Sequence, residues 1–192
     1  MRTIPAPAAA LGLAMLALPA MAQQSRSQRL AGQDERNAYN SVFVEGGGPG
    51  LLYSLNYERI VENDFGLRVG FSYESFSASA GGSSASASIV AIPVIASYLG
   101  LSSGNHVLEL GAGATGIYAN GAGSVTGLSA SGSGMTALGT VLIGYRRQPM
   151  NGGFQFRIGM EVLVGKGLAL SNPNPDSIGV LPWMYMSLGF TL

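Results

Sequence analysis

Cysteine is absent from this sequence of 192 residues, histidine occurs once, and charged residues make up 10% of the chain. Without cysteine the fold has no disulfide bonds and no thiolate ligand for a metal. Ordinary soluble domains carry about 25% charged residues, so this chain has few of the groups that keep a protein surface in water. The formal net charge is zero, and the basic surface that nucleic-acid binding requires is missing. We therefore expect no nucleic-acid partner.

The chain after its first residues also lacks an apolar run long enough for a transmembrane helix. The longest run, Ile89–Leu101, contains Pro93 and falls short of the roughly 20 residues that such a helix needs. The first residues combine a basic residue, an apolar run and the small-residue motif Ala20-Met21-Ala22, which are the features of a secretory signal peptide. We predict that residues 1–22 are this peptide. An exported, apolar chain without a spanning helix can still cross a membrane as a closed β-barrel.

A polar segment at residues 23–37, which we expect to be a flexible periplasmic lead-in, is followed by sequence that alternates with a period of two. In FGLRVGFSYE, residues 65–74, every second side chain is apolar and the others are polar or glycine. This alternation is typical of strands with one face toward lipid and one toward a lumen. Residues 38–192 are therefore predicted to form an eight-stranded, antiparallel, up-and-down transmembrane β-barrel. The expected strands lie near residues 39–47, 50–61, 64–76, 87–99, 105–118, 135–148, 153–165 and 181–192.

The connections between these strands alternate in length. Those at residues 62–64, 100–104 and 149–153 are short, whereas those at 77–86, 119–134 and 166–180 are longer and rich in serine, glycine and asparagine. Bacterial outer-membrane barrels have short periplasmic turns and long external loops. We therefore expect flexible loops outside the cell and both termini in the periplasm. The glycine-rich stretch at residues 46–50 leaves open whether residues 39–61 form a hairpin or one long, irregular strand.

Aromatic side chains recur at one depth on the predicted lipid face. Near the periplasmic ends of the strands the outward residue is aromatic in six cases: Tyr57, Phe65, Tyr98, Tyr145, Phe154 and Phe190. Aromatic girdles of this kind mark the headgroup level in outer-membrane barrels. The common depth and the common parity favour a girdle over aromatic residues scattered through a core.

Six charged residues fall on the predicted lumenal face: Glu58, Arg68, Glu109, Arg146, Arg157 and Glu161. The interior of an eight-stranded barrel is just wide enough for side chains to fill it, and arginine pairs with carboxylates through two parallel hydrogen bonds. We predict that these residues form an ionic network that closes the lumen, with Glu161 a little further from the periplasm. The alternative for the same residues is an ion-conducting or gated pore. Glycines on this face, among them Gly66 and Gly159, would leave room for the long arginine side chains.

Signs of an enzyme or a cofactor-binding protein are weak. His106 is the only histidine, so no second base accompanies it, and it is predicted at the periplasmic rim. GAGATG at residues 111–116 matches the dinucleotide-binding pattern, but no helix follows it as that pattern requires. The acidic residues are too dispersed for a metal site. We expect no catalytic residue, no cofactor and no metal.

Several stretches together resemble a known family: VFVEGGGPGLLYSLNYER, IPVIASYLG, NHVLELGAG, GYRRQPMNGGFQFRIG and the closing PWMYMSLGFTL. They are similar to the small, mostly uncharacterised outer-membrane β-barrel proteins related to the OmpA/OmpX-type barrels. The resemblance implies a bacterial outer-membrane location, and a C-terminal strand that the barrel assembly machinery reads during biogenesis. Members generally end in an aromatic residue, whereas this chain ends in Leu192.

These observations favour a structural outer-membrane barrel with a lumen closed by ion pairs. Its expected partners are outer-membrane lipid and, during biogenesis, the barrel assembly machinery, and we expect a monomer. Two other functions stay open: a small passive channel or transporter for small solutes, and a secreted barrel that binds an apolar ligand. A secreted barrel of this kind would carry its apolar residues inside, whereas in this sequence the charged residues are predicted to face the lumen.

Overall fold

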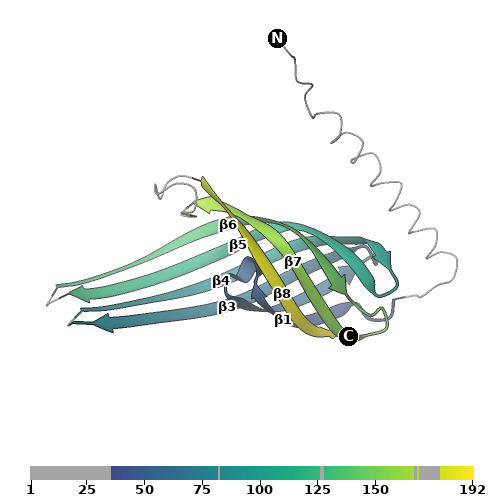
Figure 1. Cartoon of the computed structure of the whole chain (residues 1–192), viewed down its shortest axis with the longest axis horizontal. Coiled ribbons are helices and arrows are strands. Elements are labelled where there is room, and N and C mark those ends of the chain that lie inside the picture. Colours follow the sequence, from purple (N-terminus) through teal and green to yellow (C-terminus); the bar gives the residue numbers. More distant parts are fainter. Residues whose placement is uncertain (1–35, 82, 126–127, 167, 169–177) are drawn as a thin grey trace, which may run out of the picture.

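The computed structural model describes residues 36–81, 83–125, 128–166, 168 and 178–192. Within them the chain forms eight antiparallel strands and one 3-10 turn: β1 (Asn40–Gly47), η1 (Gly48–Gly50), β2 (Tyr53–Val61), β3 (Phe65–Ala80), β4 (Ser83–Ser103), β5 (His106–Val125), β6 (Leu128–Arg147), β7 (Gly153–Lys166) and β8 (Ile178–Thr191). Each strand pairs with the next, and β8 pairs with β1 to close the barrel (Figure 1). The predicted fold class is confirmed. Among the same residues, no helix is long and apolar enough to cross a membrane.

The predicted signal peptide, residues 1–22, and most of the expected lead-in, residues 23–37, lie outside the described residues. The last residues of the lead-in contact the barrel. The backbone N–H groups of Asn37 and Ala38 both donate to the carbonyl oxygen of Met150 at 3.0 Å, and Arg36 is buried. We call this end of the barrel, which also holds the C-terminus, the turn end.

Burial alternates along the strands as the sequence pattern predicts. In β2 the even-numbered side chains face the lumen and are buried, and the odd-numbered side chains face outward and are exposed. The outward side chains are large and apolar, and Val44, Leu55 and Leu67 are each more than half exposed. The barrel therefore has an apolar outer belt and a polar interior, the reverse of a soluble barrel.

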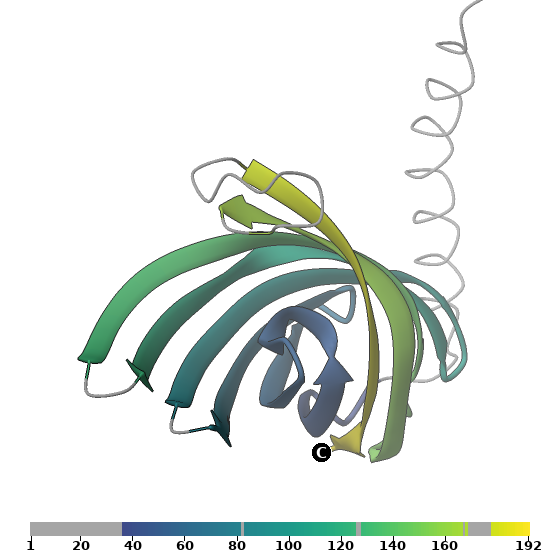
Figure 2. The ribbon, with the colours of Figure 1, turned by 60° about the vertical axis from the view of Figure 1, so that its left-hand side comes forward.

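Residues 39–61 form two strands rather than one. β1 and β2 pair as a hairpin, with Val44 opposite Leu55, and η1 connects them. Gly47 and Gly48 have φ angles of 70° and 77°, a region that side chains with a Cβ rarely adopt. These angles turn the connection inward, so that Gly48–Gly50 is buried and lies inside the ring of strands (Figure 2).

Four strands continue beyond the barrel at the opposite end, which we call the hairpin end. β3 to β6 pair with one another up to their turns, whereas β2 pairs with β3 only as far as Phe71 and β7 pairs with β6 only as far as Leu138. An open four-stranded sheet therefore extends past the barrel (Figures 1 and 2). We call it the projecting sheet: residues 72–80, 83–92, 116–125 and 128–137.

This sheet shows that the prediction of flexible loops at residues 77–86 and 119–134 is wrong. The composition resembles that of a linker because serine, alanine and glycine supply no large apolar face. The same residues nevertheless alternate, as in Ser84-Ala85-Ser86, and pairing with neighbouring strands satisfies the backbone hydrogen bonds. The third predicted loop, residues 166–180, lies mostly outside the described residues.

The predicted turn at residues 100–104 is also shorter than expected. β4 runs on to Ser103, with a register irregularity between Tyr98 and Leu101. The turn itself consists of Gly104 and Asn105, and the φ angle of 58° at Gly104 suits glycine. The sequence does not separate the end of β4 from the turn, because a β-bulge and a loop can both be rich in glycine and serine.

Candidate functional site: the ionic lumen

The six charged residues predicted on the lumenal face all lie inside the barrel. They come from five strands, and the exposed fraction of each is 2% or less: Glu58, Arg68, Glu109, Arg146, Arg157 and Glu161. Five of them join one chain of ion pairs, and Glu161 does not. A carboxylate that the sequence analysis did not include, Glu45 of β1, completes the chain.

The chain of ion pairs alternates in sign across the lumen. Arg68 donates to Glu45 at 2.7 Å, and the same carboxylate lies 4.0 Å from Arg157. Arg157 also binds both oxygens of Glu109, with its Nε at 3.0 Å from Oε2. Three guanidiniums and three carboxylates thus form a neutral series, which we call the ion chain: Arg68, Glu45, Arg157, Glu109, Arg146 and Glu58.

Glu109 is the most connected member of the ion chain. Besides Arg157, it accepts a hydrogen bond from Arg146 at 3.2 Å and one from the Ser97 hydroxyl at 2.8 Å. Arg146 in turn donates to Glu58 at 2.8 Å. Buried charges are costly unless they are paired and hydrogen-bonded, and these contacts supply that pairing from β2, β4, β5, β6 and β7 together.

The same alternation that located the other lumenal charges also places Glu45 inward. In SVFVEGG, residues 41–47, Val42 and Val44 face outward, and Ser41, Phe43 and Glu45 are buried. Phe43 lies between two cations of the ion chain, with its ring centre 4.6 Å from the Arg157 guanidinium carbon and 5.8 Å from that of Arg68. Because β1 is short and ends in glycines, the sequence analysis left its end open and did not assign Glu45 to the lumen.

Glu161 has a different environment from the one the sequence analysis assigned to it. Its register partners are Leu142 on β6 and Trp183 on β8, which places it nearer the hairpin end than the ion chain. Neither of its carboxylate oxygens has a hydrogen-bond partner, and none of the ion pairs found among the described residues involves it. The greater distance of Glu161 from the turn end agrees with the prediction, whereas its place outside the ion pairs does not.

Neutral polar side chains fill the lumen between the ion chain and the turn end. Arg146 donates to Gln148 at 3.1 Å, Gln148 donates to Ser41 at 3.1 Å, and Ser41 donates to Thr191 at 3.3 Å. Thr191 in turn donates to Gln155 at 3.0 Å. A small apolar cluster of Ile60, Leu99 and Val107, with Tyr39 packed against it, occupies the same end of the barrel.

The inward turn occupies the lumen on the other side of the ion chain. The Thr115 hydroxyl donates to the Pro49 carbonyl oxygen at 2.9 Å, and Trp183 Nε1 donates to that of Leu51 at 3.3 Å. Leu51 and Trp183 also pack against a buried cluster of Ala91, Ile117, Leu138 and Leu163. The ion chain therefore lies between two further layers of side chains, one apolar and one mostly neutral and polar.

The predicted aromatic girdle residues all lie outside the lumen. Five of them are at least 40% exposed, and Tyr98 is half-buried. Neighbours around the rim contact one another, with ring centres 5.5 Å apart for Phe65 and Tyr98 and 6.2 Å apart for Phe154 and Phe190. Tyr57 and Tyr145 complete the set on β2 and β6, and these rings surround the turn end of the apolar belt.

The glycines of the lumen make room for more than the arginines. A Cβ atom at Gly66 would lie 2.7 Å from the Glu58 carboxylate, and one at Gly159 would lie 2.7 Å from the Tyr185 ring. At these two positions the expectation that glycine accommodates arginine is therefore wrong. A strand glycine often marks such a close approach, but the sequence does not say which side chain approaches.

The single histidine of the sequence lies on the outer surface of the barrel. His106 lies exposed at the turn end, where its Nδ1 is 2.6 Å from the Tyr145 hydroxyl. Among the described residues, no group of three or more His, Asp or Glu side chains could hold a metal ion.

Comparisons with known proteins give a likeness of fold. No protein-family model and no curated protein matches the chain. Among solved structures, Ail, the attachment invasion locus protein of Yersinia pestis, is 14% identical over 80% of this chain and 97% of its own, with a TM-score of 0.48. The N-terminal β-barrel domain of Pseudomonas aeruginosa OprF is 11% identical over 83% of this chain and 100% of its own, with a TM-score of 0.49. CarO2 of Acinetobacter baumannii is 16% identical over 81% of this chain and 99% of its own, with a TM-score of 0.37. These structures are small outer-membrane β-barrels, the kind that the sequence resembles, and at these identities the likeness concerns the fold alone.

Proposed function

We propose that this protein is a bacterial outer-membrane β-barrel with a closed lumen, which anchors the projecting sheet outside the cell. The ion chain carries the proposal. Six buried charges that alternate in sign and sum to zero form a plug from β1, β2, β3, β5, β6 and β7, and layers of side chains cover it on both sides. An open ionic pore would instead keep its charges in contact with water.

The apolar belt supports the membrane location. The charged outward side chains of the described strands lie at the two rims: Arg59 and Arg147 at the turn end and Lys166 at the hairpin end. Arg59 and Arg147 are hydrogen-bonded there, to the Asn40 side chain at 2.8 Å and to the Phe154 carbonyl oxygen at 3.2 Å. A basic residue at the bilayer midplane would cost about 2–4 kcal/mol, so this distribution suits a barrel that spans a bilayer.

The same surface argues against a secreted barrel that binds an apolar ligand. Such a protein needs an apolar cavity and a polar exterior, whereas here the buried lumen holds arginine and glutamate and the exposed belt holds leucine, valine and phenylalanine. We further propose that the signal peptide directs export, that the barrel assembly machinery inserts the chain with its turn end in the periplasm, and that the barrel functions as a monomer surrounded by outer-membrane lipid.

Two measurements test this function. The protein should fractionate with outer membranes and show heat-modifiable mobility on detergent gels, and a soluble periplasmic product would contradict the membrane barrel. In planar bilayers the wild type should give no steady current, because the ion chain closes the lumen. Arg157→Ala removes a central cation and should give brief, irregular openings. Steady unitary steps from the wild type, equal to those of the variant, would show a channel instead.

A further inference from the structure

The outward face of the projecting sheet carries a regular array of hydroxyl groups. Serine occupies nearly every outward position beyond Tyr73, and the inward positions hold mainly alanine and glycine. In one row across the four strands, Ser75 lies opposite Ser88, Ser88 opposite Asn120, and Asn120 opposite Ser133. Because neighbouring strands lie about 4.8 Å apart, these polar groups stand side by side.

The next row toward the tips repeats the arrangement. Ser77 lies opposite Ser86, Ser86 opposite Ala122, and Ala122 opposite Ser131. The strand pairing fixes these positions, and a serine side chain has little rotameric freedom to lose on binding. The hydroxyl array is therefore held in place before any ligand arrives.

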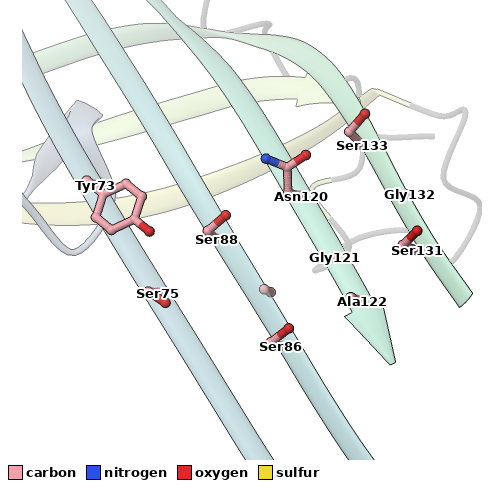
Figure 3. A pocket seen from close by; sticks show the side chains of 11 residues that line it. Tyr73, Ser75, Ser86, Ser88, Asn120, Gly121, Ala122, Ser131, Gly132 and Ser133 are labelled. Carbon is pink, nitrogen blue, oxygen red and sulfur yellow. The ribbon is translucent and has the colours of Figure 1, made fainter. Parts of the chain in front are cut away.

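A shallow groove of about 590 Å³ runs across this face. Its size falls within the range of roughly 300–1,000 Å³ that is usual for ligand sites. The side chains of β3, β4, β5 and β6 that line it are shown in Figure 3, from Tyr73 on β3 to Ser131 and Ser133 on β6. Its lining residues are Tyr73, Ser75, Ser86, Ala87, Ser88, Asn120, Gly121, Ala122, Ser131, Gly132 and Ser133.

The chemistry of the groove selects a neutral ligand rich in hydroxyl groups. None of the lining residues is charged, and the sequence has no Asp, Glu, Lys or Arg at residues 75–88 or 118–135, so a phosphate or sulfate group would find no counter-charge there. Each serine hydroxyl both donates and accepts, and the Asn120 amide does the same. Tyr73 adds an aromatic face with a polar tip. Sugars offer the matching combination of hydroxyl groups and a small apolar face.

We propose that the groove binds the uncharged oligosaccharide chain of the glycolipids around the barrel in the outer leaflet. This inference rests on the proposed outer-membrane location. The groove continues the lipid-facing side of the strands, beginning at Tyr73, just beyond Phe71 of the apolar belt. A glycolipid whose acyl chains contact the belt therefore carries its sugars alongside the groove.

The test uses the full mature barrel in detergent micelles and, as a probe, core oligosaccharide released from lipopolysaccharide, dephosphorylated and carboxyl-reduced so that it carries no charge. Saturation-transfer NMR should show binding to the wild type. Ala122→Phe fills the groove with a ring and should abolish the signal. Gly123→Phe adds the same ring to the other face of the same strand, at a position that does not line the groove, and should bind as the wild type does.

A second pair of variants removes single polar groups without filling the groove. Asn120→Ala should weaken binding about tenfold, the effect of losing one or two hydrogen bonds. Ser79→Ala makes a comparable change on the same face outside the groove and should leave binding unchanged. Equal binding by Ala122→Phe, Asn120→Ala and the wild type would overturn the proposal, as would binding that requires the phosphate groups.

Failure of the glycan proposal can be distinguished from failure of the proposed function. Heat-modifiable mobility is measured on the same samples. A protein that shows no folded, heat-modifiable form in detergent contradicts the membrane barrel itself. A folded barrel that gives no saturation transfer from the oligosaccharide overturns the glycan site and leaves the barrel in place.

Discussion

The ion chain makes a prediction about charge balance that can be worked out from its order. Replacing Glu109 by glutamine leaves three guanidiniums against two carboxylates, and replacing Arg157 by methionine leaves three carboxylates against two guanidiniums. Removing one partner of a buried ion pair costs about 3–5 kcal/mol, because the other charge stays buried and uncompensated. Each single variant should therefore lose about that much free energy of unfolding.

The double variant should behave differently. Glu109 and Arg157 are adjacent in the middle of the ion chain, so removing both leaves two complete pairs: Arg68 with Glu45 at 2.7 Å and Arg146 with Glu58 at 2.8 Å. Neither remaining pair has an unbalanced charge. We expect the double variant to be no less stable than either single variant, which corresponds to a coupling energy of at least about 3 kcal/mol.

The assay is urea unfolding of the folded barrel in phospholipid vesicles, followed by the fluorescence of Trp183, the only tryptophan. The cation–π contact of Arg157 with Phe43 is lost in both the single and the double variant, so it cancels from the coupling energy. Glu161→Gln serves as the control, since Glu161 is equally buried but has no ion-pair partner among the described residues. The two single variants each lose a certain free energy of unfolding. If the sum of these losses equals the loss of the double variant to within about 0.5 kcal/mol, the ion chain is refuted.

Three further perturbations test the belt, the girdle and the lumen. Val141→Arg should destabilise the barrel in vesicles by about 2–4 kcal/mol. Met135→Arg lies on the same face of β6 but in the projecting sheet, so it should change the urea midpoint little. Equal effects of the two variants would place the apolar belt elsewhere. Phe190→Ala removes a ring contact at the rim and should lower the yield of heat-modifiable barrel more than Leu192→Ala, and equal yields would contradict the girdle. Gly66→Ala brings a Cβ to 2.7 Å from a buried carboxylate and should cost about 1–3 kcal/mol in urea unfolding; a neutral result would mean that the carboxylate has room to move.

The order of the contacts in the lumen could not be predicted from the sequence. Alternation assigns Glu58, Arg146 and Glu161 to the inner face equally well, and Glu161 was predicted to lie further from the periplasm, but neither observation says which side chains contact one another. Depth depends on how far each strand is shifted against its neighbour when the barrel closes. That shift puts Glu161 opposite Trp183, away from the ion chain, and brings Glu45 of the short β1 into contact with Arg68.

By itself, the sequence determined a barrel of antiparallel strands and the two faces of each, because consecutive side chains on a strand point to opposite sides and lipid tolerates only apolar ones. It left open whether residues 39–61 form one strand or two. Only the tertiary structure decided that the serine-rich segments continue as strands and that Gly48–Gly50 turns into the lumen. Strands built from serine, alanine and glycine are held by backbone hydrogen bonds to neighbouring strands and not by a large apolar face, so their composition resembles that of a loop. The inward turn is held by Thr115 and Trp183 from across the barrel, and these partners are distant in sequence.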